Sequence, residues 1–268
     1  MDSPDWRLWS NAFPTWSPKG MRLERLAEKQ RSLLLDIVKA SLGPTGYATV
    51  RAAMKLNGAL GLLVGDYHDT LTEYTYWFTV FGEPASGDPW GWQLMGHHVD
   101  VHCVFVGTQL VLAPVFLGAE PASAETGPYA GVSAFGRETD AGLALRRALR
   151  ADQEGRFLQG SSVLSADLPE ELAGPFNGRH LAGAGADNLV LPLDGIPGAD
   201  LDGGQRGLLM DLVAVYTSRL PTEHVRRKCQ AVADHLDETR FATIVREPHG
   251  NDYGKDLLAQ HYARHHTR

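Results

Sequence analysis

The chain of 268 residues has little of several features that mark specialised protein classes. Its two cysteines, Cys103 and Cys229, are too few for a disulfide framework or a four-thiolate zinc site. No run approaches the roughly 20 apolar residues that cross a membrane. The first residues also lack the basic and apolar segments of a signal peptide. These absences lead us to expect a cytoplasmic protein with no membrane partner.

Clusters of basic residues are also missing from the sequence. The formal net charge is −7, and lysines and arginines are spread along the chain. Because phosphate binding needs clustered Lys and Arg, we expect no nucleic-acid partner. The glycine-rich stretches contain no phosphate-loop motif, and Ser161 and Ser162 lack the context of a catalytic serine. Hydrophobic residues make up 43% of the chain, which indicates a globular fold.

The first 20 residues differ from the rest of the chain. They contain Trp6, Trp9 and Trp16, and they follow neither a helical nor a strand period. Aromatic residues of this kind anchor a segment onto its own domain or onto a partner. We therefore expect an N-terminal arm over residues 1–20, with a homo-oligomer formed through it as one option, and a single domain over residues 21–268.

Hydrophobic periodicity predicts helices on both sides of a central sheet. Apolar steps of three and four predict helices over residues 21–42, 47–60, 138–150, 205–220, 221–236 and 252–266. Aromatic and β-branched residues predict strands over residues 72–81, 90–106, 110–116 and 241–245. With a hairpin turn at Gly107 and Thr108, this order favours an α+β fold. Its centre would be an antiparallel sheet with a long hairpin, flanked by N-terminal and C-terminal helices.

The densest group of ionisable residues lies inside the longest predicted strand. Alternation along a strand places His98, Asp100 and His102 on one face. His97 takes the other face, although a slip of one residue in register would exchange His97 and His98. His98 and His102 start about 13 Å apart on a flat strand, so Asp100 paired with one of them is the stronger metal-site hypothesis. The alternative is a solvated polar face without a site.

Two further positions carry candidate residues. His261 and His265 stand four residues apart on the predicted last helix, a spacing that lets two imidazoles bind one metal ion. Solvated histidines at a helix end are the alternative interpretation. Glu120 follows the returning strand of the hairpin, so we expect it near one end of the sheet.

Several segments resemble a known family. They are residues 81–84, 89–98, 114–121 and 245–258, followed by His261 and Tyr262, and they include the blocks Trp-Gly-Trp, Gly-His-His and Asn-Asp-Tyr-Gly. On these residues the chain resembles the domain-of-unknown-function 3500 family over nearly its whole length. The resemblance implies no particular reaction. It adds three residues of the last segment as candidates for substrate binding: Arg246, Asn251 and Tyr253.

The chain departs from the family pattern in two places. Relatives often carry Asn where this chain has His102, so a ligand role for His102 would be particular to this chain. Relatives also carry a longer stretch, with Tyr-Tyr-Arg-Ile and His-Ile-His elements, where residues 238–245 connect the two sides directly here. If the longer stretch supplies strands or catalytic groups in relatives, this chain has a changed or lost activity.

The leading hypothesis is a metal-dependent enzyme, with hydrolysis as its reaction. The candidate ligands of a divalent Zn, Fe or Mn ion are His98, Asp100, His102, His261 and His265. Such an ion would lower the pKa of a bound water molecule. His97, His98 and Glu120 are the candidate acid and base groups. Trp90 and Trp92 would line a pocket for a small organic substrate.

Two alternatives come from other functional classes. The first is a metal-free isomerase, lyase or cyclase in which His97 and His98 move protons near neutral pH. The second is a non-catalytic ligand-binding or assembly protein whose N-terminal arm docks on a neighbouring subunit. Activity that survives chelation would indicate the first, and an oligomer that depends on residues 1–20 would indicate the second.

Overall fold

The computed structural model describes residues 4–10, 18–65, 68–84, 87–160 and 193–244. The described residues divide into two compact units, one within residues 4–134 and one within residues 135–244. The α+β class is confirmed, since helices accompany sheets that are mostly antiparallel. No boundary at residue 134 is expected from the sequence, and the single domain over residues 21–268 stays a prediction.

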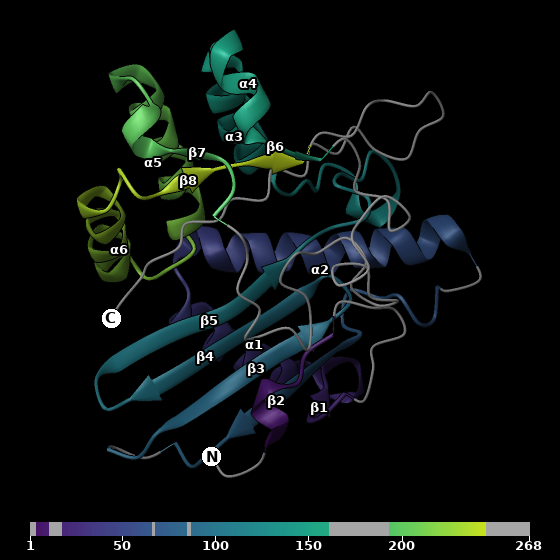
Figure 1. The fold of residues 1–268 in the computed structure, drawn as a ribbon. Coiled ribbons are helices and arrows are strands. Elements are labelled where there is room, and N and C mark those ends of the chain that lie inside the picture. The colour runs from purple at the N-terminus through teal and green to yellow at the C-terminus, as the bar shows by residue number, and fades with distance from the viewer. Residues whose placement is uncertain (1–3, 11–17, 66–67, 85–86, 161–192, 245–268) are drawn as a thin grey trace. The chain divides into compact units, whose positions relative to one another are not determined.

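The first unit is built on a five-stranded antiparallel sheet (Figure 1). Its strands lie in chain order: β1 (Met21–Arg22), β2 (Tyr76–Phe81), β3 (Trp90–Gly96), β4 (Val99–Val106) and β5 (Gln109–Leu117). Gly107 and Thr108 form the turn between β4 and β5, since Val106 pairs with Gln109. This turn confirms the hairpin that the sequence predicts.

Helices cover one face of this sheet. The unit contains α1 (Glu28–Ser41), α2 (Pro44–Val64) and the short 3-10 helices η1 (Pro4–Arg7), η2 (Leu23–Arg25) and η3 (Gly127–Tyr129). Val38 of α1 and Met54 of α2 are buried in one cluster with Phe78 and Trp92 of the sheet. Burial of these apolar side chains is the main force that holds helices and sheet together.

Two predicted helix boundaries in this unit are wrong. The helix predicted from Met21 begins at Glu28, because Met21 and Arg22 instead pair with β2 at the edge of the sheet. The second helix continues past Gly61, which was expected to break it. A Cβ atom at Gly61 would lie 2.1 Å from the carbonyl oxygen of Leu71, so this glycine lets the segment before β2 approach the helix.

The single strand predicted over residues 90–106 is also wrong. It is two strands, β3 and β4, with Gly96 pairing to Val99 across a two-residue turn made of His97 and His98. His98 has a φ of 62°, in the left-handed region that few residues other than glycine adopt. The sequence lacks the Asn-Gly or Asp-Gly signal of such turns, so periodicity alone continues the strand through it.

The other face of the sheet carries the described part of the N-terminal arm. Gln93 Nε2 donates a hydrogen bond to the carbonyl oxygen of Leu8 at 2.7 Å. The ring of Trp9 lies 5.5 Å from that of Phe116 on β5. Residues 4–10 of the arm thus pack on the sheet of their own chain, and an oligomer formed through the arm stays a prediction.

The second unit has its own apolar core. Its helices are α3 (Gly136–Ala148), α4 (Ala151–Phe157), η6 (Gly198–Asp200), α5 (Gly203–Thr217) and α6 (Thr222–Asp234), and its strands are β6 (Leu158–Gly160), β7 (Ile196–Pro197), β8 (Arg240–Phe241) and β9 (Thr243–Ile244). β6 pairs with β9 in parallel and β7 with β8 in antiparallel fashion. Leu145, Leu212 and Phe241 are buried together. Of the helices that the structure describes, none is long and apolar enough to cross a membrane.

Candidate functional site

The two-residue turn between β3 and β4 brings two imidazoles together. The ring centroids of His97 and His98 lie 3.8 Å apart, with an angle of 36° between the ring planes. Adjacent residues within a strand would point to opposite faces, so the turn is what allows this contact. The expectation that His98 shares a strand face with Asp100 and His102 is therefore wrong.

Glu120 reaches the same turn from the segment after β5. The backbone amide of Gly118 donates a 2.7 Å hydrogen bond to the carbonyl oxygen of His98, which holds this segment beside the turn. Glu120 Oε2 then lies 3.5 Å from His98 Nε2. The position predicted for Glu120, near an end of the sheet, is confirmed.

His97, His98 and Glu120 form a group that could hold a metal ion. One ligand atom from each residue lies within 4.8 Å of the ligand atoms of the other two. Two imidazoles and one carboxylate occur together in catalytic zinc sites and in the facial triad of non-haem iron enzymes. The Glu120 side chain is 65% exposed, so a small molecule in solution has access to this group.

A residue of α2, Asn57, contacts the His97 side chain. The Nδ1 atom of His97 lies 2.9 Å from Oδ1 of Asn57, and Nδ2 of Asn57 donates to the carbonyl oxygen of Thr72 at 2.8 Å. The hydroxyl of Tyr76 donates to the backbone carbonyl of His97 at 3.0 Å. Burial raises the pKa of Tyr76 well above its usual value, so this donor stays protonated.

The environment of His97 favours its neutral form. The pKa of His97 is lowered from 6.5 to about 3. Burial of the ring is the largest cause and the nearby His98 the second, while Glu120 has a smaller, opposing effect. Desolvation disfavours the charged form of an imidazole, which explains the direction. At neutral pH His97 therefore has one ring nitrogen with a lone pair, as a metal ligand or a general base requires.

Asp100 and His102 belong to a different cluster, on the sheet face under the arm. Both are buried, and Asp100 Oδ2 lies 3.0 Å from His102 Nε2. Gln93 on the neighbouring strand places Nε2 2.9 Å from Asp100 Oδ1 and 2.8 Å from His102 Nε2. The structure thus brings Asp100 and His102 together, and it does not bring them to His98 as one metal site.

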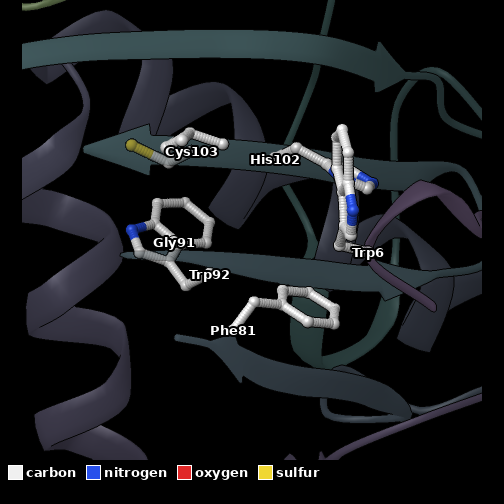
Figure 2. Close-up of a pocket in the computed structure, with 7 residues that line it drawn as sticks. Trp6, Phe81, Gly91, Trp92, His102 and Cys103 are labelled. Atoms are coloured by element: carbon white, nitrogen blue, oxygen red, sulfur yellow. The ribbon is translucent and has the colours of Figure 1, made fainter. Parts of the chain in front are cut away.

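A small pocket lies beside this second cluster. Trp6, Phe81, Gly91, Trp92, His102, Cys103 and Val104 line it. Figure 2 shows Trp6 and His102 at one side of the pocket, and Trp92 and Cys103 at the other. Burial raises the pKa of Cys103 to about 12, so its thiol is protonated at neutral pH and is not a nucleophile here.

The tryptophans expected to bind substrate lie away from the paired histidines. Trp92 is buried in the helix-facing core, where its Nε1 donates to Ser41 Oγ at 3.1 Å. Trp90 stacks on Phe105 with ring centroids 4.5 Å apart. At roughly 3.3 Å per residue, Trp90 and Trp92 lie about 20 and 13 Å from the turn end of β3. The structure does not bring them to His97.

Five other candidates cannot be placed. Arg246, Asn251, Tyr253, His261 and His265 lie outside the described residues. The roles predicted for them stay predictions.

Sequence reasoning missed Asn57 and Tyr76, which both contact His97. Asn57 lies in an apolar stretch of the predicted second helix, between Leu56 and Gly58. A polar residue among inward-facing apolar ones is a signal of a buried hydrogen bond, although it does not name the partner. Tyr76 was expected as a strand residue without a polar role.

A comparison with known protein families identifies the family of this chain. One family model matches residues 1–253, which is nearly the whole chain. The chain belongs to the DUF3500 family. The family is described as a protein of unknown function, so membership assigns no reaction to this DUF3500 chain. No curated protein and no solved structure matches it.

Proposed function

We propose that the chain is a metal-dependent enzyme, with hydrolysis of a small organic substrate as its reaction. His97, His98 and Glu120 would bind one divalent Zn, Fe or Mn ion. The observation that carries the proposal is the convergence of their three ligand atoms within 4.8 Å. These residues come from the β3–β4 turn and from the segment after β5, so the fold rather than local sequence brings them together.

The distances support a metal site of ordinary size. Ligand atoms bound tetrahedrally at about 2.1 Å from an ion lie about 3.4 Å from one another. The 3.5 Å between His98 Nε2 and Glu120 Oε2 already matches this separation. The ligand atom of His97, within 4.8 Å of the other two, would complete the set.

Three protein ligands would leave one coordination position of a metal ion open for water or substrate. A four-coordinate catalytic site keeps its fourth position for water or substrate, and the ion lowers the pKa of the bound water towards neutrality. In this arrangement Glu120 serves as a ligand, in place of the acid or base role that the sequence suggested. The exposed Glu120 side chain gives substrate a path to the site.

Metal uptake by the purified chain tests the proposal. We expect one Zn, Fe or Mn ion per chain by elemental analysis, or uptake of one Co²⁺ or Zn²⁺ after chelation. His98→Gln and Glu120→Gln should each weaken binding at least about 10-fold, because each removes one of three protein ligands. His68→Gln is the matched surface control, and His102→Asn tests the buried histidine of the other cluster. Both should bind metal as the unaltered chain does.

Two results would overturn the metal site. One is the absence of uptake at micromolar metal concentrations. The other is equal loss of binding in His102→Asn and in His98→Gln. With binding established, a panel of ester, amide and phosphoester substrates should reveal hydrolysis that chelation removes and added metal restores.

A second function uses the same residues without a metal. The contact between His98 and Glu120, with the His97 ring beside that of His98, also suits an imidazole–carboxylate pair that moves protons. An isomerase, lyase or cyclase of this type would keep its activity under chelation and lose it in His98→Ala. The two functions are therefore separated by one chelation experiment.

A further inference from the structure

Asn57 stands out among the residues that contact the paired histidines. It is buried at 3% exposure in α2, in an otherwise apolar part of the helix. A buried amide lowers stability unless its polar atoms find hydrogen-bond partners. Its partners are the carbonyl oxygen of Thr72 and the ring of His97, and His97 lies 40 positions away in sequence.

The first partner fixes which way the amide faces. The Thr72 carbonyl oxygen can only accept a hydrogen bond, so the Asn57 atom beside it must be the NH₂ group. The other atom, Oδ1, then faces His97 Nδ1 at 2.9 Å. Because Oδ1 can only accept, Nδ1 of His97 must carry the proton.

The same argument decides the state of the other ring nitrogen. A neutral imidazole with a proton on Nδ1 has its lone pair on Nε2. The backbone of His97 is held as well, by the hydroxyl of Tyr76 on its carbonyl oxygen. Ring orientation and tautomer are therefore both determined by contacts on the side of the ring that faces α2.

We infer that Asn57 is the positioning residue of the His97–His98–Glu120 site, which holds His97 as the Nδ1–H tautomer and presents Nε2 to a metal ion. The role of Nε2 as a ligand rests on the proposed function. Hydrogen bonds to the far nitrogen of a ligating histidine orient the ring and raise its affinity for metal, and their loss costs about 10–100-fold in binding. Asn57 belongs to a different element from every proposed ligand, so local sequence does not reveal this role.

The tautomer can be measured on the full chain without metal. Two-bond proton–nitrogen correlations of ¹⁵N-labelled imidazoles distinguish a protonated Nδ1 from a protonated Nε2. The chain has 11 histidines, and loss of one set of signals in His97→Gln assigns His97. We expect His97 to be the Nδ1–H tautomer. An Nε2–H tautomer, or a mixture of the two, would overturn the inference whether or not metal binds.

Variants at position 57 then test the consequence for metal binding. Asn57→Leu removes the acceptor, so we expect mixed tautomers and Co²⁺ or Zn²⁺ affinity lower by about 10–100-fold. Asn57→Asp keeps an oxygen that accepts from Nδ1 but loses the NH₂ group that donates to Thr72, so the Nδ1–H tautomer should persist in a less stable chain. Gln93→Leu is the matched control, because it removes another buried amide, from β3 of the same unit, without touching His97.

The outcomes separate this inference from the proposed function. Full affinity in Asn57→Leu, with metal bound normally by the unaltered chain, would overturn the positioning role alone. Absence of metal uptake by the unaltered chain would overturn the proposed function and the ligand role of Nε2 together. Equal losses of affinity in Gln93→Leu and Asn57→Leu would show a general effect of destabilisation and would also overturn the inference.

Discussion

His97 and His98 are neighbours in sequence whose rings contact each other, with centroids 3.8 Å apart. Neighbours in a strand cannot do this, because their side chains leave on opposite faces. The contact depends on the left-handed backbone of His98, with its φ of 62°. Backbone strain of this kind is concentrated at functional sites, where the surrounding structure maintains it.

The first prediction concerns this strain. Replacing His98 with glycine should raise the free energy of unfolding by about 1 kcal/mol relative to replacing it with alanine, because only alanine keeps a Cβ atom in the left-handed region. Both variants should lose metal binding. Fluorescence-detected denaturation suits the comparison, since the five tryptophans among the described residues all lie in the first unit. Equal stability of the two variants would contradict a strained turn.

The second prediction concerns the buried pair under the N-terminal arm. His102→Leu removes the ring that lies 3.0 Å from Asp100 Oδ2 and leaves this buried carboxyl group with one partner fewer. The free energy of unfolding should fall by about 2 kcal/mol, the usual cost of leaving a buried polar group with a partner missing. Metal affinity should stay unchanged. A variant of unaltered stability would show that the pair contributes nothing to folding.

The third prediction follows from the lowered pKa of His97. Between pH 6.5 and about pH 3 the unfolded chain binds a proton at His97 that the folded chain does not bind. The contribution of His97 to the free energy of unfolding is therefore largest above pH 6.5. It falls by about 1.4 kcal/mol for each pH unit below that value.

Denaturation curves at several pH values check this sign. Other groups also titrate in acid, so the comparison is with His97→Gln, which lacks the His97 contribution. From pH 6.5 to about pH 4.5, the unaltered chain should lose about 2 kcal/mol more stability than the variant. Parallel curves for the two proteins would contradict the lowered pKa.

The fourth prediction tests the close approach at Gly61. An alanine there would place its Cβ atom 2.1 Å from the Leu71 carbonyl oxygen, so the backbone must shift. We expect Gly61→Ala to lower the free energy of unfolding by about 2 kcal/mol, as overpacking does. It should also weaken metal binding, because Leu71 precedes the residue whose carbonyl accepts from Asn57.

A second helical glycine supplies the control for this substitution. Gly207 in α5 is exposed, and a Cβ atom there would meet no other atom within 4 Å. Gly207→Ala should therefore raise helix stability by up to about 1 kcal/mol. Thermal unfolding followed by circular dichroism compares the two variants. A loss of stability in both would indicate that crowding at Gly61 is not the cause.

Local sequence patterns predicted much of the fold and identified the members of the candidate site one by one. Apolar periodicity located α1 and α2 apart from their ends, and Gly107 marked the β4–β5 turn. His97, His98 and Glu120 were each candidates from their residue types and positions. Their grouping was not predicted, because the turn at His97 and His98 carries no glycine or asparagine to announce it.

The sequence by itself determined the α+β class, the segments that form helices and strands, and the absence of clustered basic residues. These properties depend on residues a few positions apart, and periodicity records them directly. Only the tertiary structure decided that Glu120 and Asn57 meet the paired histidines, while Asp100 and His102 lie under the arm. Such contacts join residues far apart in the chain, and they depend on how whole elements pack rather than on any local pattern.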